Sequence, residues 1–145
     1  MRRSLHHPRL GARGAALWLA VAAAGCGGGA QPPAAATSRG ARLYIASCLA
    51  CHQPDGRGIS GVQPPLAGTP VTIGEPAALL AWVMFGERPA ELPKGRYTGL
   101  MPQFGYLADA DLAELLSHVR ASFGNRAAPV TAAMVAAARA AHRRG

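Results

Sequence analysis

The segment Cys48-Leu49-Ala50-Cys51-His52 decides the interpretation of this chain. Two cysteines separated by two residues and followed at once by histidine form the attachment signature of a c-type haem. Each thiol can add to one vinyl group of the porphyrin, and the short spacing holds both sulfurs along one edge of the ring. The next residue, His52, is then placed to give a nitrogen to the iron. We therefore expect one covalent haem c, anchored at Cys48 and Cys51, with His52 as an iron ligand.

Two other kinds of site also use paired cysteines. A structural zinc site requires four ligands, and no second pair of Cys or His follows at zinc-finger spacing, because His118 and His142 stand alone in the sequence. A thioredoxin-type pair opens a helix after a strand in a βαβ unit, and the sequence around Cys48 has no such pattern. The motif and its surroundings therefore favour haem.

The first 25 residues have the composition of an export signal. Four arginines precede a short apolar run from Ala15 to Ala24, which is too short to span a membrane and lies where a secretory signal belongs. The segment Ala23-Ala24-Gly25-Cys26 resembles a bacterial lipobox, although Ala23 stands where leucine is usual. We expect a lipidated Cys26 to tether the exported chain to a membrane on its periplasmic side. The alternative is cleavage after another small residue, with Cys26 incidental.

Composition limits the classes of partner. The formal net charge of +8 includes the four arginines of the expected signal, and the remainder carries eleven Lys and Arg against seven Asp and Glu. These basic residues are scattered and lack interleaved aromatic residues, a pattern that excludes nucleic-acid binding but is compatible with steering of redox partner proteins. Three cysteines are an odd number, which argues against a disulfide framework.

We expect the chain to have four parts. They are a signal peptide at residues 1–25, a flexible linker at 26–37, a haem-binding domain at 38–126 and a C-terminal helical extension at 127–145. The linker is rich in Gly, Pro and Ala and has almost no large apolar residue. Thr37 or Ser38 can cap the first helix, over Arg39 to Ala46. Gly40 lies four residues before Tyr44, which suggests that a second helix approaches there.

Three further segments have helical patterns. Pro76 suits the first turn of a short helix over Glu75 to Phe85. The strongest pattern runs from Asp109 to Phe123. Its single apolar stripe comprises Leu112, Leu115, Leu116, Val119 and Phe123. Thr131 can cap a last helix from Ala132 to Arg144, whose thin apolar side predicts that it lies on the surface or frays.

The loop after the cysteine motif carries a family resemblance. Residues 53–68 contain four glycines and three prolines, which excludes regular helix or central strand. The class I cytochrome c family has a Gly-rich loop after its CxxCH and then a Pro-x-Leu-x-Gly segment, matched here by Pro64, Leu66 and Gly68. The resemblance implies an all-α cytochrome c fold with three to five helices around one covalent haem. It also implies that the Pro64 carbonyl accepts the Nδ1–H of His52 and so orients the imidazole.

The segment from Tyr97 to Gly105 resembles the distal-ligand segment of the same family. Pro102 removes a backbone donor and restricts Met101 to extended geometry, which helps to aim the thioether inward. We therefore expect Met101 to be the second iron ligand. The rivals are the histidines, Met84 on the predicted middle helix, where core packing is the ordinary role of methionine, and Met134 in the extension.

The resemblance implies a one-electron carrier and not an enzyme, because iron held by His52 and Met101 has no open site for a small-molecule substrate. Expected partners are a dehydrogenase that donates electrons and an oxidase or reductase that accepts them. Tyr97 is either a hydrogen-bonding residue near the haem or a core tyrosine. Two alternatives stay open. One is a cytochrome subunit of a membrane dehydrogenase or oxidase complex, and the other is a five-coordinate gas-binding or peroxidase-like protein in which Met101 does not ligate.

Overall fold

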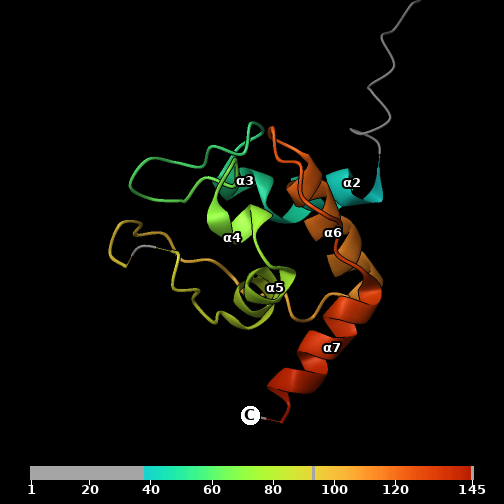
Figure 1. Cartoon of the computed structure of the whole chain (residues 1–145). Helices are drawn as coiled ribbons and strands as arrows, with labels where there is room; N and C mark the ends of the chain where they lie inside the picture. The colour runs from blue at the N-terminus through green and yellow to red at the C-terminus, as the bar shows by residue number, and fades with distance from the viewer. Residues whose placement is uncertain (1–37, 93, 145) are drawn as a thin grey trace, which may run out of the picture. The chain divides into compact units, whose positions relative to one another are not determined.

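The computed structural model describes residues 38–92 and 94–144, and within these ranges the chain is helical and contains no β-strand (Figure 1). The helices are α2 (Arg39–Ser47), α3 (Leu49–His52), α4 (Pro70–Ile73), α5 (Pro76–Phe85), α6 (Asp109–Ala121) and α7 (Ala132–His142). The predicted all-α class is therefore confirmed. The expected signal peptide, the linker and Cys26 lie outside the described residues.

The first described helix, α2, begins where the sequence predicts it. Ser38 accepts a hydrogen bond from the amide of Ala41 at 3.1 Å and so caps the first turn. Helix α2 then packs against α6 (Figure 1). Gly40 lies at the contact, because an added Cβ would come within 2.3 Å of the carbonyl oxygen of Glu114. The close helix approach predicted from Gly40 is present.

Helix α6 contributes residues to both apolar clusters of the domain. The larger cluster comprises Leu79, Leu80, Val83 and Met84 of α5, Leu112, Ala113 and Leu116 of α6, and Phe104, Val130 and Val135. The smaller cluster comprises Tyr44, Leu115 and Val119. Val119 packs with Tyr44 in the smaller cluster, whereas Leu116 belongs to the larger one, because successive apolar positions of α6 face two different neighbours.

Helix α6 ends at Ala121, two residues earlier than predicted. Phe123 adopts a φ of 59° in the left-handed region, so its ring leaves the helical stripe. It packs instead against Tyr44, with ring centroids 5.2 Å apart. The predicted stripe therefore ends at Val119.

Asn125, which is buried just after α6, forms hydrogen bonds with two separate segments of the chain. Its amide nitrogen donates to the carbonyls of Val119 at 2.9 Å and Leu66 at 3.2 Å. Its side-chain oxygen accepts the amide of Gly68 at 2.7 Å. These three bonds tie the end of α6 to the loop that follows His52.

Helix α4 is a single turn that the sequence reasoning missed. Thr69 caps it by accepting the amide of Thr72 at 3.3 Å. Arg120 of α6 is only 2% exposed, and its side chain binds the backbone of α4. Its Nη1 donates to the carbonyls of Thr72 and Gly74, both at 2.8 Å, and its Nε donates to the carbonyl of Ala128 at 2.7 Å.

Helix α7 packs against both α5 and α6 (Figure 1). Thr131 caps it as predicted, accepting the amide of Met134 at 3.2 Å. Val135 is fully buried, and the ring of His142 stacks on Phe85 at 3.8 Å between centroids. Of the two alternatives for this segment, the helix lies on the domain surface, and its one buried residue joins it to the core.

Candidate haem site

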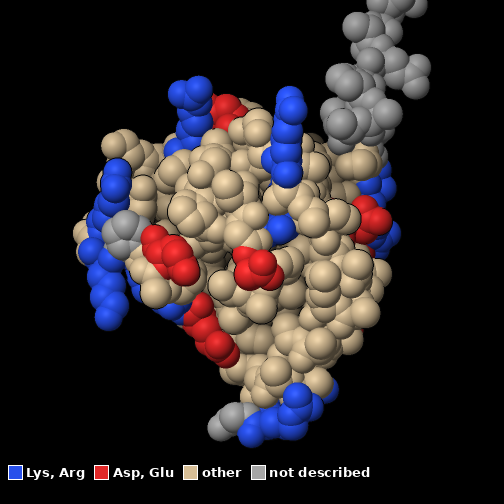
Figure 2. Space-filling view, in the orientation of Figure 1, with Lys and Arg blue, Asp and Glu red and all other residues tan. Residues whose placement is uncertain are grey.

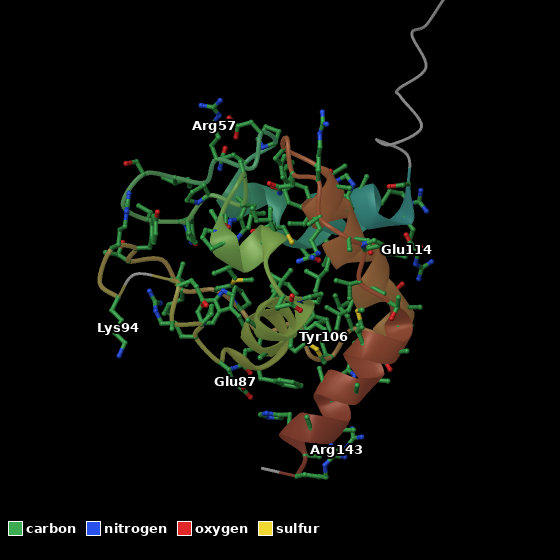
Figure 3. The ribbon with its side chains drawn as sticks, viewed as in Figure 1. Arg57, Glu87, Lys94, Tyr106, Glu114 and Arg143 are labelled. Carbon is green, nitrogen blue, oxygen red and sulfur yellow. The ribbon has the colours of Figure 1, made fainter. Side chains whose placement is uncertain are left out.

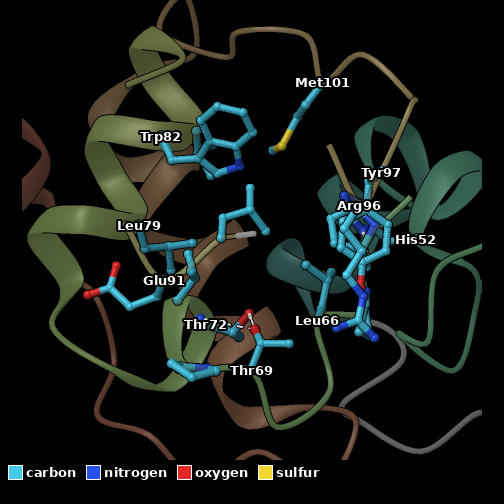
Figure 4. A pocket seen from close by; sticks show the side chains of 16 residues that line it. His52, Leu66, Thr69, Thr72, Leu79, Trp82, Glu91, Arg96, Tyr97 and Met101 are labelled. Carbon is cyan, nitrogen blue, oxygen red and sulfur yellow. Dashed lines mark hydrogen bonds between the residues drawn. The ribbon is translucent and has the colours of Figure 1, made fainter. Parts of the chain in front are cut away.

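A cavity of about 300 Å³ lies between α3, α4, α5 and the loop that carries Met101. Its walls are mostly apolar, with Leu66, Leu79 and Trp82 among the side chains that line it (Figure 4). His52 and Met101 line the same cavity. The structure therefore brings together two residues that are 49 positions apart in the chain.

His52 is the last residue of α3 and is 5% exposed. Its Nδ1 lies 3.0 Å from the carbonyl oxygen of Pro64, which is the contact that the family resemblance implies. With Nδ1–H donated to that carbonyl, Nε2 is the ring nitrogen left to bind a metal. Burial lowers the pKa of His52, and the bond to Pro64 partly opposes this shift. A neutral imidazole is the form that ligates iron.

Cys48 and Cys51 lie on one helical turn. The amides of Cys51 and His52 both donate to the carbonyl of Cys48, at 3.1 and 2.8 Å, and residues three apart on a helix share a face. Both thiols are free and half-buried. Burial raises the pKa of the Cys48 thiol to about 11, with a smaller contribution from Cys51. The backbone therefore holds both cysteines and His52 within a single helical turn.

Met101 directs its thioether into the cavity, where Figure 4 shows the sulfur near the indole of Trp82. Met84 belongs to the core cluster and Met134 is exposed on α7. Neither is among the residues that line the cavity. Met101 is thus the methionine that the fold places with His52.

Tyr97 is half-buried in the cavity wall, and the guanidinium of Arg96 lies 5.7 Å from its ring centroid. Arg96 and the α4 turn were not identified from the sequence as parts of this wall. The turn had a usable signal, since Thr69 followed by Pro70 is a helix cap followed by proline at the first position. Arg96 had no such signal, because an arginine in a loop is ordinary surface composition.

Potential metal-ligating side chains are distributed over the described part of the chain. Within residues 38–92 and 94–144, no three His, Cys, Asp or Glu side chains are grouped closely enough to hold a metal ion. His118 packs against the ring of Tyr44 at 5.8 Å between centroids, and it does not line the cavity. In the same ranges no helix is both long and apolar enough to cross a membrane.

Charged side chains are spread over the surface. Figure 2 shows Lys and Arg interspersed with Asp and Glu on the face in view, not gathered in one stripe. Arg57 and Lys94 project outward from the two long loops beside the cavity (Figure 3).

A helical fold, a CxxCH turn and an apolar cavity lined by His52 and Met101 together define a c-type cytochrome. Residues 35–119 match the family described as cytochrome c oxidase, cbb3-type, subunit III. The chain belongs to this family of c-type cytochromes, and its cofactor is haem c. The residues present fit that group, since paired thiols can anchor a haem and an imidazole nitrogen and a thioether can ligate its iron.

The chain is also similar to cytochromes of two sizes. It is 36% identical to cytochrome c-552 of Thermus thermophilus over 97 residues, 63% of this chain and 65% of that protein. It is 40% identical to the gluconate 2-dehydrogenase cytochrome c subunit of Pantoea cypripedii over 107 residues, 69% of this chain and 24% of the relative. It is 36% identical to the cytochrome c subunit of the quinone alcohol dehydrogenase of Gluconobacter oxydans over 90 residues, 61% of this chain and 19% of the relative. The chain thus spans about two-thirds of the first relative and less than a quarter of the other two.

Proposed function

We propose that this cytochrome is a one-electron carrier whose haem iron is held by His52 and Met101. The observation that carries the proposal is the convergence of both side chains on one apolar cavity beside the Cys48 and Cys51 turn. Haem c, when bound, supplies reversible one-electron chemistry between Fe(III) and Fe(II). With His52 and Met101 both holding the iron, no coordination site would remain for a substrate, so the protein would transfer electrons and not catalyse a reaction.

Each of these residues has a distinct task in this proposal. Cys48 and Cys51 would hold the porphyrin through its two vinyl groups, each by one thioether bond. The Pro64 carbonyl holds Nδ1–H of His52, which fixes the ring and increases the donor strength of Nε2. The soft thioether of Met101 favours the reduced iron and raises the reduction potential. The apolar walls act in the same direction, because they disfavour the additional charge of the oxidised site.

Electron exchange requires a surface on which a partner can dock. Two loops beside the cavity are joined by hydrogen bonds from the amides of Thr98 and Gly99 to the carbonyls of Gly61 and Val62. The joined loops expose apolar side chains next to the ligand segment, namely Ile59, Val62 and the 91%-exposed Leu100. We assign this surface to a redox partner, a dehydrogenase on the donor side and an oxidase or reductase on the acceptor side. Contacts between electron-transfer proteins are small and transient.

The same site would serve a permanent cytochrome subunit of a dehydrogenase or oxidase complex. The relatives named above as dehydrogenase subunits favour that second candidate. Purification of the protein from its native membrane distinguishes the two, because a subunit remains with a large dehydrogenase or oxidase whereas a shuttle is recovered alone.

We further propose export and tethering at the periplasmic side through lipidated Cys26. The sequence of residues 1–26 supports this, as does the need to attach haem outside the cytoplasm. The corresponding parts are a signal at 1–25, a linker at 26–37, the cytochrome domain at 38–126 and the extension at 127–145. Mass spectrometry of the mature protein tests the anchor, since a chain that begins at an unmodified residue other than Cys26 contradicts it.

The ligand set is tested by optical spectroscopy of the purified protein, oxidised, reduced, and reduced with carbon monoxide. We expect the weak near-infrared sulfur-to-iron band in the oxidised form and no response to carbon monoxide. Met101→Ala should lose the band and bind carbon monoxide, while the matched control Met134→Leu should behave as wild type. A wild-type protein without the band that binds carbon monoxide readily would have an open iron, and its function would be gas binding or catalysis.

A further inference from the structure

Helix α7 lies beyond residue 119, where the match to the cytochrome family ends. It is nevertheless part of the folded domain, since Val135 is buried in the larger apolar cluster. Near the C-terminal end of α7, the side chain of Arg139 packs against the rest of the domain. It contacts the segment that follows the proposed iron ligand.

The guanidinium of Arg139 has three acceptors. Its Nε lies 2.7 Å from Oδ1 of Asp109 at the start of α6. Its Nη1 donates to the carbonyl of Gly105 and its Nη2 donates to the carbonyl of Leu107. The side chain is 23% exposed, so these bonds are only partly screened by water. The planar, fixed geometry of a guanidinium suits it to hold two backbone carbonyls at once.

The segment held by Arg139 begins directly after the ligand loop. The chain runs from Met101-Pro102 to Phe104, whose amide donates to the carbonyl of Val83 at 2.8 Å. The amide nitrogen of the Gln103 side chain donates to the carbonyl of Phe85 at 2.9 Å. Helix α5 thus binds the segment after Met101 through the carbonyls of Val83 and Phe85. Helix α7 binds the same segment through Arg139.

We propose that Arg139 is a positioning residue that keeps the Met101 loop closed on the iron, so that α7 acts as a latch. This inference rests on the ligation of iron by Met101 proposed above. A thioether is a weak ligand, and a loop opens locally with a probability set by the hydrogen bonds that must break. The bonds from Arg139 are charge-assisted and are among the stronger ones in this segment.

The latch is tested with the full-length holoprotein and an external ligand that captures the open iron. Cyanide binds the oxidised form only after the thioether has left, so its binding rate reports loop opening. Arg139→Gln should raise this rate about tenfold or more, because the donors to two carbonyls are weakened or lost. Arg139→Lys retains the charge but not the planar guanidinium that donates to two carbonyls at once. It should give an intermediate rate of cyanide binding. The control Arg143→Gln removes the same charge one turn away on an exposed residue and should match wild type.

Two outcomes separate the latch from a simpler role for Arg139. A lower melting temperature of Arg139→Gln with an unchanged cyanide rate would overturn the proposal and leave Arg139 as a structural contact. If Arg139→Gln does not fold, a wild-type rate in the folded Arg139→Lys protein would overturn it equally. Rapid cyanide and carbon monoxide binding by the wild type would contradict Met101 ligation itself, whatever the Arg139 variants do.

Discussion

At the scale of single residues, His118 shows how a neighbouring element changes a side chain's environment. In the sequence, His118 lies outside the apolar stripe of α6. In the structure it lies against Tyr44 and is half-buried at the contact with α2. Burial lowers the pKa of His118. The helix pattern could not show this, because the covering ring belongs to a residue 74 positions away in the chain.

This environment of His118 predicts a pH dependence of stability. In the unfolded chain its pKa returns to about 6.5, so between the lowered pKa and that value the unfolded state binds more protons. The contribution of His118 to the free energy of unfolding should therefore have its full value above about pH 6.5. It should decrease as the pH falls through this window. Urea unfolding of the holoprotein across the window should show this decrease, and His118→Gln should reduce it. An identical pH profile for the variant would contradict the assignment.

At the scale of elements, helices with a clear apolar face or cap could be predicted and those defined by distant contacts could not. Helices α2, α5 and α7 begin at Arg39, Pro76 and Ala132, as their cap or proline signals indicate. The end of α6 was wrong by two residues, because the side chain of Asn125 captures the carbonyl of Val119. The packing of α7 was also undetermined, since one buried valine is a weak signal in a helix made mostly of alanine.

The packing of α7 can be measured by comparing neighbouring residues. Val135 is fully buried and Met134 is exposed. Val135→Ala should lower the free energy of unfolding by about 2 kcal/mol through lost burial and the cavity left behind. Met134→Ala should change it by less than about 0.5 kcal/mol. Equal effects of the two substitutions in denaturant unfolding would show that α7 is detached from the core in solution.

At the scale of the whole molecule, the cavity that His52 and Met101 line joins segments from several parts of the chain. The sequence predicted the order of anchors and candidate ligands, because CxxCH, Pro64 and Met101 are local motifs. It could not predict the complete wall of the cavity, to which the α4 turn, Trp82 and Arg96 contribute from separate segments. That wall is a property of the assembled chain.

The protein without haem should therefore lose most of its fixed structure. Without haem, the apolar lining of the cavity has no packing partner and is exposed to water. A small domain has a stability of only about 5–15 kcal/mol, so the loss of this packing removes a large part of it. The double variant Cys48→Ser/Cys51→Ser, purified free of haem, should show reduced far-ultraviolet circular dichroism and no cooperative thermal transition. A helical spectrum with a sharp transition would contradict this expectation.

The contact between α2 and α6 also constrains the order in which the protein is made. Arg39 and Asp111, which form an ion pair across it, are 72 residues apart in the chain. Such a long loop closes slowly compared with local helix formation. During synthesis from the N-terminus, α2 and the cysteine motif emerge well before α6 is available to cover them. Cys48 and Cys51 are therefore presented on an open, nascent chain, and covalent attachment can precede the folding that later encloses them.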